Sequence, residues 1–191
     1  MNRFWKAISI ATLLLVGIVV AGCSSNKKSS GDAANVTSKP NQAAAKTGNA
    51  IGDTAPDFHL ASIGGAPISL ADLRGQPAVL VFWTAWCPVC KEEAPHFNQL
   101  AAQYEPLGVR VLGINIQDSL ARTESGIKDF GIRYTIVRDA DAGVARLYKV
   151  TGTPTIVFLD RQSTVRYFGN ELPAAYPARL DALLKEESSA Q

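Results

Sequence analysis

Between residues 82 and 91 the chain reads Phe82-Trp83-Thr84-Ala85-Trp86-Cys87-Pro88-Val89-Cys90-Lys91. The first two of these residues end a continuous apolar run, 78–83, which predicts a central strand buried on both faces. Residues 87–104 repeat apolar side chains at helical spacing, so we expect a helix to begin at Cys87. The two cysteines therefore stand where a buried strand gives way to a helix.

The spacing of the two cysteines indicates redox chemistry. Residues three apart share one face of a helix, so the sulfur atoms of Cys87 and Cys90 can meet. At a helix N-terminus the first amide donors lack partners and the dipole favours an anion, which should lower the pKa of Cys87 below the free value of about 8.5. Pro88 suits the first turn of the helix, where a missing N–H costs nothing.

An asymmetric cysteine pair of this kind exchanges disulfides in two steps. We expect Cys87 to be the nucleophile that attacks a substrate disulfide, and Cys90, one turn further in and less exposed, to be the resolving cysteine. Half of a zinc site is a weaker hypothesis, because a structural site needs four ligands and only His59 and His96 are left, with no second pair at suitable spacing. We therefore predict no metal site. A purely structural disulfide is also a weaker hypothesis, because the loop it would close is so small that it would constrain the unfolded chain little.

The rest of the chain alternates strand and helix patterns, which predicts an α/β domain of three layers. Strands are expected at 58–61, 68–70, 78–83, 109–116, 134–137, 155–159 and 165–168. Helices are expected at 87–104, 121–130, 141–148 and 176–187, the third with Asp139 or Asp141 as N-cap. The 191 residues carry a net charge of +2, which gives no reason to expect a nucleic-acid partner.

The first 50 residues differ from this domain. Arg3 and Lys6 precede an apolar run, 7–21, of signal-peptide length, which is short for a membrane span of roughly 20 apolar residues. The run ends in Val20-Ala21-Gly22-Cys23, which resembles a bacterial lipobox. This resemblance implies a signal peptide at 1–22 and a lipid on Cys23. Polar composition then predicts a flexible tether at 23–50 before the domain at 51–191.

Several motifs together resemble the thioredoxin superfamily, specifically the membrane-anchored ResA/TlpA/CcmG-like thiol-disulfide oxidoreductases with their AhpC/TSA-type redoxin domain. They are Ala55-Pro56-Asp57-Phe58, Leu73-Arg74-Gly75-Gln76-Pro77, Trp86-Cys87-Pro88-Val89-Cys90, Pro95 and Gly152-Thr153-Pro154-Thr155. The resemblance implies a thioredoxin-like fold: a central mixed β-sheet flanked by helices, with an N-terminal β-hairpin and an inserted strand and helix at roughly 106–138.

The resemblance also implies a substrate-binding surface around the cysteines. Pro154 would be a cis-proline packed against the pair, leaving the Thr153 backbone free to pair with an extended substrate segment. We expect Trp86, Pro88 and Val89 to contribute to the same surface, whereas Trp83 is expected in the core.

The sequence departs from the family in its acidic residues. Thioredoxins carry a buried aspartate six residues before the first cysteine, where this chain has Val81, and ResA-like proteins often carry a glutamate between the cysteines. Glu92 and Glu93 are expected to be solvated, and Asp118 to be a loop residue. His59 and His96 are expected to have no role in the chemistry.

These inferences predict a lipid-anchored, extracytoplasmic thiol-disulfide oxidoreductase, periplasmic or on the cell surface. It would act on protein thiols and disulfides in the reducing direction, with cytochrome c maturation as one setting. The Cys87–Cys90 disulfide would be its redox group, with no other cofactor and with electrons from a membrane protein. Alternatives are a disulfide-donating oxidase, a non-catalytic thioredoxin-fold binding module, and a peroxiredoxin-type peroxidase, for which Thr84 matches the required motif but Leu80 does not.

Overall fold

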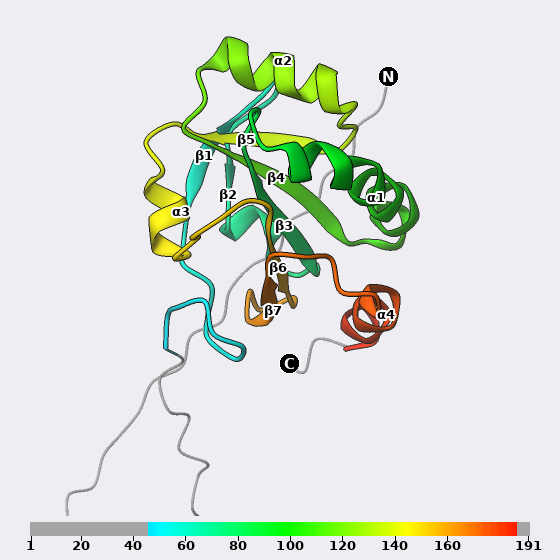
Figure 1. Ribbon diagram of the computed structural model, residues 1–191. Helices are drawn as coiled ribbons and strands as arrows, with labels where there is room; N and C mark the ends of the chain where they lie inside the picture. The colour runs from blue at the N-terminus through cyan, green and yellow to red at the C-terminus, as the bar shows by residue number, and fades with distance from the viewer. Residues whose placement is uncertain (1–45, 187–191) are drawn as a thin grey trace, which may run out of the picture. The chain divides into compact units, whose positions relative to one another are not determined.

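The computed structural model describes residues 46–186, which form one mixed seven-stranded sheet with helices on both faces (Figure 1). The strand order is β2-β1-β5-β4-β3-β6-β7. The strands are β1 (His59–Ser62), β2 (Ile68–Ser69), β3 (Ala78–Trp83), β4 (Arg110–Ile116), β5 (Thr135–Asp139), β6 (Thr155–Leu159) and β7 (Val165–Gly169). The helices are α1 (Pro88–Tyr104), α2 (Leu120–Phe130), α3 (Gly143–Leu147) and α4 (Tyr176–Lys185), with short 3-10 turns at Ala71–Leu73 and Glu105–Leu107.

Strand β3 lies at the centre of the sheet and is buried along its whole length. Its side chains alternate between two cores, as the period of a strand requires. Leu80 and Phe82 pack in the core under α3, whereas Val79, Val81 and Trp83 pack in the core under α1 and α4. Two covered faces explain why the sequence of this strand is continuously apolar, and they confirm the predicted α/β architecture.

The sheet also contains the two additions that the family resemblance implied. Strands β1 and β2 pair antiparallel as an N-terminal hairpin, with Leu60 opposite Ile68. Strand β4 lies parallel between β3 and β5, and α2 makes the crossover from β4 to β5. Since β3 and β4 run in the same direction, Trp83 at the end of β3 pairs with Asn115 near the end of β4. The residues after both strands therefore emerge at the same edge of the sheet.

The structure corrects both the predicted bounds and the predicted N-cap of α3. This helix is shorter than expected, and its N-cap residue is Ala142 in the left-handed region, φ 57°, with no side-chain cap. Asp139 nevertheless satisfies the helix start from the end of β5, because its carboxylate accepts hydrogen bonds from the backbone N–H groups of Val144 (3.2 Å) and Ala145 (2.8 Å). Within residues 46–186, no helix is both long and apolar enough to cross a bilayer.

Tyr148 fastens the chain after α3 to the start of the domain. Its ring packs on Phe82, with centroids 5.3 Å apart, and its hydroxyl donates to the carbonyl of Pro56 at 2.9 Å. Burial, aided by the charge of Asp57, raises the pKa of Tyr148 above its usual value. Because the pKa of Tyr148 is higher in the folded than in the unfolded protein, its contribution to stability is fully present below pH 10, the usual tyrosine pKa. That contribution is lost as the pH rises above this value.

We therefore expect Tyr148→Phe to lower the free energy of unfolding by about 1–3 kcal/mol at pH 7, because the Pro56 carbonyl loses its partner. The difference in free energy of unfolding between the wild type and this variant should shrink above pH 10, because only the wild-type protein has a tyrosine whose ionisation favours the unfolded state. Urea titrations from pH 7 to pH 11 measure this difference, and parallel stability curves for the two proteins would contradict it.

Candidate active site

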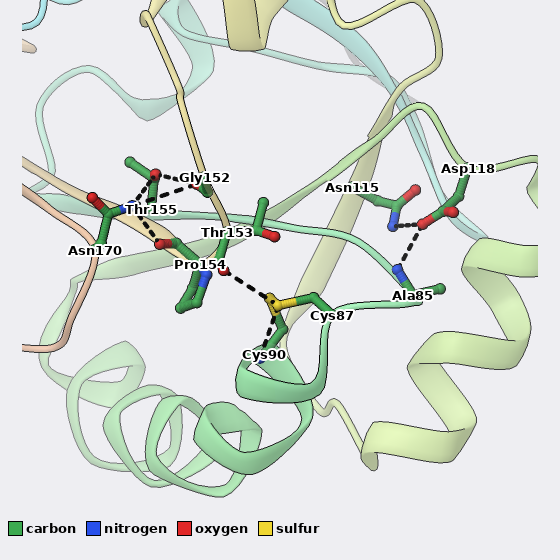
Figure 2. Close-up of a disulfide and its surroundings, with 10 residues drawn as sticks. All are labelled: Ala85, Cys87, Cys90, Asn115, Asp118, Gly152, Thr153, Pro154, Thr155 and Asn170. Carbon is green, nitrogen blue, oxygen red and sulfur yellow. Dashed lines mark hydrogen bonds between the residues drawn. A yellow bond between two sulfur atoms is a disulfide. The ribbon is translucent and has the colours of Figure 1, made fainter.

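The connection from β3 to α1 carries both cysteines. Cys87 is the N-cap residue of α1, with extended backbone, and Pro88 occupies the first helical position. The Cys87 sulfur accepts a hydrogen bond from the backbone N–H of Cys90 at 3.1 Å. The two residues form a disulfide (Figure 2). The cap contact shows why a thiolate at Cys87 would be favoured, since it would receive an amide hydrogen and face the positive end of the helix.

The expected difference in exposure between the two cysteines is wrong. Cys87 is 4% exposed and Cys90 is 5% exposed, because the disulfide holds both sulfur atoms beneath the same surface. Their surroundings differ instead. Cys87 borders an open depression of about 430 Å³, lined also by Ala85, Trp86, Pro88, Lys91, Asp129 and Phe130. Cys90 borders a closed region lined by Val81, Trp83, Phe97, Phe130, Ile132, Tyr134 and Pro154.

The residues expected to meet a substrate surround Cys87 at the surface. Trp86 is 65% exposed and Val89 is 50% exposed, and Pro88 is also exposed. Trp83 is buried, as expected, with its ring 5.7 Å from that of Phe130. The apolar patch beside the redox pair thus consists of side chains that the fold does not need for its core.

The loop at 152–155 lies directly against the disulfide. The Thr153–Pro154 peptide bond is cis, as the resemblance implied. The Thr153 carbonyl oxygen is 3.3 Å from the Cys87 sulfur, and Pro154 lines the closed region beside Cys90 (Figure 2). The structure thus brings together two segments that are more than sixty residues apart in the chain.

Asn170, which the sequence analysis missed, holds this loop in place. Its side-chain amide donates to the Pro154 carbonyl at 2.9 Å and to the Thr155 hydroxyl at 3.0 Å. The Thr155 hydroxyl in turn donates to the Gly152 carbonyl at 2.6 Å. A single asparagine after the last strand carries no signal in the sequence that would link it to a loop sixteen residues earlier.

We expect Asn170→Ala to lower the free energy of unfolding by about 1 kcal/mol, the usual net contribution of such hydrogen bonds. We also expect a several-fold lower kcat/KM for a protein disulfide, since the loop facing the cysteines loses its anchor. Chemical denaturation and an insulin-reduction assay measure the two effects. An unchanged kcat/KM would show that the loop holds its position without Asn170.

Of the acidic residues considered in the sequence, Glu92 and Glu93 lie at the surface as expected, whereas Asp118 does not. Glu92 is exposed, and Glu93 pairs with the exposed His96 at 3.1 Å, so both are surface groups. Asp118, expected to be an ordinary loop residue, is only 5% exposed, and its carboxylate accepts a hydrogen bond from the backbone N–H of Ala85 at 2.7 Å. His59 is exposed on β1, and within residues 46–186 no group of His, Cys, Asp and Glu side chains could hold a metal ion.

Residues 51–168 match the AhpC/TSA family. The chain belongs to this family. It is 36% identical over 121 residues to the thiol-disulfide oxidoreductase ResA of Geobacillus thermodenitrificans, covering 63% of this chain and 70% of that protein. It is 31% identical over 114 residues to ResA of Bacillus subtilis, covering 60% and 64%. A crystal structure of a secreted disulfide oxidoreductase of Mycobacterium tuberculosis, homologous to E. coli DsbE, superimposes with a TM-score of 0.56 at 34% identity, covering 66% of this chain and 93% of that one.

This AhpC/TSA-family protein is a thiol-disulfide oxidoreductase with a thioredoxin-like fold. The predicted signal peptide at 1–22, the lipidated Cys23 and most of the predicted tether at 23–50 lie outside the described residues. They remain predictions from the sequence.

Proposed function

We propose that the protein is a lipid-anchored, extracytoplasmic reductant of protein disulfides, in which Cys87 attacks and Cys90 resolves. The observation that supports this proposal most strongly is the position of Cys87. Its sulfur caps α1, accepts the Cys90 N–H and borders the open depression, whereas the Cys90 surroundings are closed and apolar. A thiolate is favoured at a helix start and disfavoured in apolar surroundings, so the two cysteines differ in reactivity although they are equally buried.

The reaction then transfers two electrons to the substrate. The Cys87 thiolate attacks one sulfur of a substrate disulfide, which forms a mixed disulfide and releases the other substrate sulfur as a thiolate. Cys90 loses its proton and attacks the Cys87 sulfur. This second step forms the Cys87–Cys90 disulfide and releases the second substrate thiolate. A membrane dithiol protein would return the pair to its reduced form by the same two steps.

The substrate would lie across the exposed patch as an extended segment. Trp86, Pro88 and Val89 offer exposed apolar contact next to the cysteines, and the Thr153–Pro154 segment lies against the disulfide. Backbone pairing of the substrate with Thr153 would add a strand-like contact. This arrangement selects cysteines in extended or unfolded segments, such as the haem-site cysteines of an apocytochrome c, which we propose as the substrate class.

The lipobox-like sequence ending in Cys23 supports the proposed anchor. We expect the full-length protein expressed in a bacterium to fractionate with membranes and to carry a diacylglyceryl group on the N-terminal cysteine by mass spectrometry. Cys23→Ala should abolish the lipid and leave the activity of the domain unchanged. A wild-type protein that keeps residues 1–22, or that lacks the lipid, would refute the anchor.

The direction of electron flow is tested by the reduction potential of the pair, measured by equilibration with glutathione or dithiothreitol. We expect a value near that of thioredoxin, about −270 mV, whereas a value near about −120 mV would make the protein a disulfide donor. Peroxide consumption by the reduced protein, measured alongside, tests the peroxidase alternative. Rapid turnover of peroxide would favour that alternative over protein disulfide reduction.

A further inference from the structure

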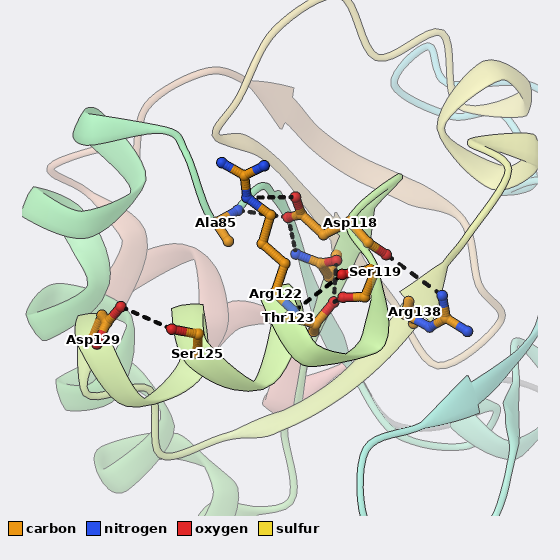
Figure 3. Close-up of polar contacts among 9 residues, drawn as sticks. Ala85, Asp118, Ser119, Arg122, Thr123, Ser125, Asp129 and Arg138 are labelled. Carbon is orange, nitrogen blue, oxygen red and sulfur yellow. Dashed lines mark hydrogen bonds and ion pairs between the residues drawn. The ribbon is translucent and has the colours of Figure 1, made fainter.

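Asp118 is a buried carboxylate next to the site that the chemistry above does not use. It follows β4, and its Oδ2 accepts two hydrogen bonds, from the backbone N–H of Ala85 at 2.7 Å and from the side-chain amide of Asn115 at 2.9 Å (Figure 2). Its Oδ1 lies 3.7 Å from Nε of Arg122, a side chain that is 62% exposed (Figure 3). Hydrogen bonds to an ionised carboxylate are about twice as strong as neutral ones.

The partners of Asp118 hold the carboxylate in a fixed position. Asn115 is fully buried in β4, and its side-chain oxygen accepts a hydrogen bond at 2.7 Å from the hydroxyl of Thr123, itself fully buried in α2. Strand β4 and helix α2 therefore determine where the carboxylate lies. Ala85, in contrast, belongs to the connection between β3 and α1, which lies outside the helices and strands and whose own backbone hydrogen bond runs from the Cys87 N–H to the Thr84 carbonyl at 3.3 Å.

A second contact ties the same connection to α2. A Cβ atom built on Gly126, in the interior of α2, would lie 2.7 Å from the Cβ of Ala85 and 3.0 Å from the ring of Trp83. Any other residue would push the connection away. Glycine inside a helix costs roughly 1 kcal/mol relative to alanine. Its presence here permits the close approach of α2 to the backbone that leads to Cys87.

We propose that Asp118 is a positioning residue for disulfide exchange, which fixes the backbone at Ala85 and thereby the place of Cys87. Ala85 stands two residues before Cys87, and the intervening Trp86 is mostly exposed and provides little anchorage. The hydrogen bond from Ala85 thus helps to set the Cys87 sulfur against the helix start, the Thr153 carbonyl and the open depression. The inference rests on the proposed role of Cys87 as the attacking group.

The test compares Asp118→Ala with Asp118→Asn, in which the amide oxygen can still accept the Ala85 N–H. The measurement is the second-order rate constant with which the reduced full-length protein attacks dithionitrobenzoate, at a temperature where each variant is folded. We expect the alanine variant to be at least tenfold slower than the wild type and the asparagine variant to be within threefold. Gly126→Ala should be several-fold slower as well, since it displaces Ala85 by a different route.

Asp160 provides the matched control. It is also a buried carboxylate that accepts backbone N–H hydrogen bonds, from Gln162 and Thr164, and pairs with an arginine. It follows β6 at the end where Leu159 pairs with Ala78, opposite to the end that carries Cys87. Asp160→Ala should lower the melting temperature and leave the rate constant unchanged.

Three results would overturn the inference: an unchanged rate in Asp118→Ala, an equal loss in Asp118→Asn, or an equal loss in the folded Asp160→Ala control. Failure of the proposed function is recognised separately. If Cys87→Ser still reacts with dithionitrobenzoate while Cys90→Ser does not, the assignment of the attacking cysteine is wrong, whatever the Asp118 variants do.

Discussion

Replacing Cys87 by serine is expected to abolish disulfide exchange, with a loss of at least about 1,000-fold in kcat/KM, because a hydroxyl cannot serve as the attacking thiolate. The same substitution at Cys90 should act differently. Cys90→Ser leaves the helix-capping sulfur and the open depression intact, so the first attack proceeds and the reaction stops at the mixed disulfide. The two variants are matched controls for each other, since the chemical change is the same and the positions are three residues apart.

The outcome is read by non-reducing electrophoresis and mass spectrometry after incubation with a protein disulfide such as insulin. Cys90→Ser should accumulate a covalent adduct on Cys87 that dithiothreitol releases, and Cys87→Ser should accumulate none. Adduct formation by Cys87→Ser at the rate of Cys90→Ser would contradict the assignment. An absence of adducts with both variants would favour a binding module without catalysis.

Val81→Asp is expected to have the largest effect on stability. Val81 is 1% exposed in the middle of β3, opposite Gly113 and Ile156 in the neighbouring strands, and it lines the closed region beside Cys90. An unpaired polar group buried there costs about 1–3 kcal/mol, and each unit by which burial raises the carboxyl pKa adds about 1.4 kcal/mol at neutral pH. We expect a total loss of about 3–6 kcal/mol at pH 7.

Val81→Asn separates the two contributions, because it is polar and of similar size but carries no charge. The aspartate in the folded state has a raised pKa, so its extra cost is absent below the unfolded pKa near 4 and grows as the pH rises above it. Urea titrations between pH 3 and pH 8 should show the two variants diverging with increasing pH. Equal stability of both variants at pH 8 would show that Val81 lies in more polar surroundings than the structure indicates.

The same pair of variants probes the absence of an acid beside Cys90. Among the described residues that line this closed region, none is acidic. A carboxylate at position 81 would accept the Cys90 proton and should speed the release of the mixed disulfide about tenfold relative to Val81→Asn, a modest general-base effect. Stopped-flow measurement of the resolving step tests this, and equal rates would show that deprotonation of Cys90 does not limit it.

The fold was predictable where the pattern is local. The apolar run of β3 requires cover on both faces, and its bounds, 78–83, agree with the strand in the structure. The helix after it begins at Pro88, one residue after the predicted start, because Cys87 serves as its cap. The position of the cysteines follows from these two elements. The centre of the candidate site could therefore be predicted from a stretch of ten residues.

The remainder of the site depends on contacts between distant segments. Asp118 and Ala85 are 33 residues apart, and only the parallel pairing of β3 with β4 brings them together. Asn170 reaches the 152–155 loop because β6 and β7 form an antiparallel pair. The equal burial of the cysteines was also unpredictable, since exposure depends on the neighbouring loop and helix rather than on helical spacing.

The central claim, that Cys87 rather than Cys90 carries the reactive thiolate, is tested most directly by alkylating the reduced wild-type protein with iodoacetamide between pH 4 and pH 10. Peptide mass spectrometry then gives the extent of modification at each cysteine. We predict that Cys87 is modified first, with a pKa below the free value of about 8.5, and that Cys90 reacts only at higher pH. Modification of Cys90 before Cys87, or of both cysteines with one pKa near 8.5, would contradict the account.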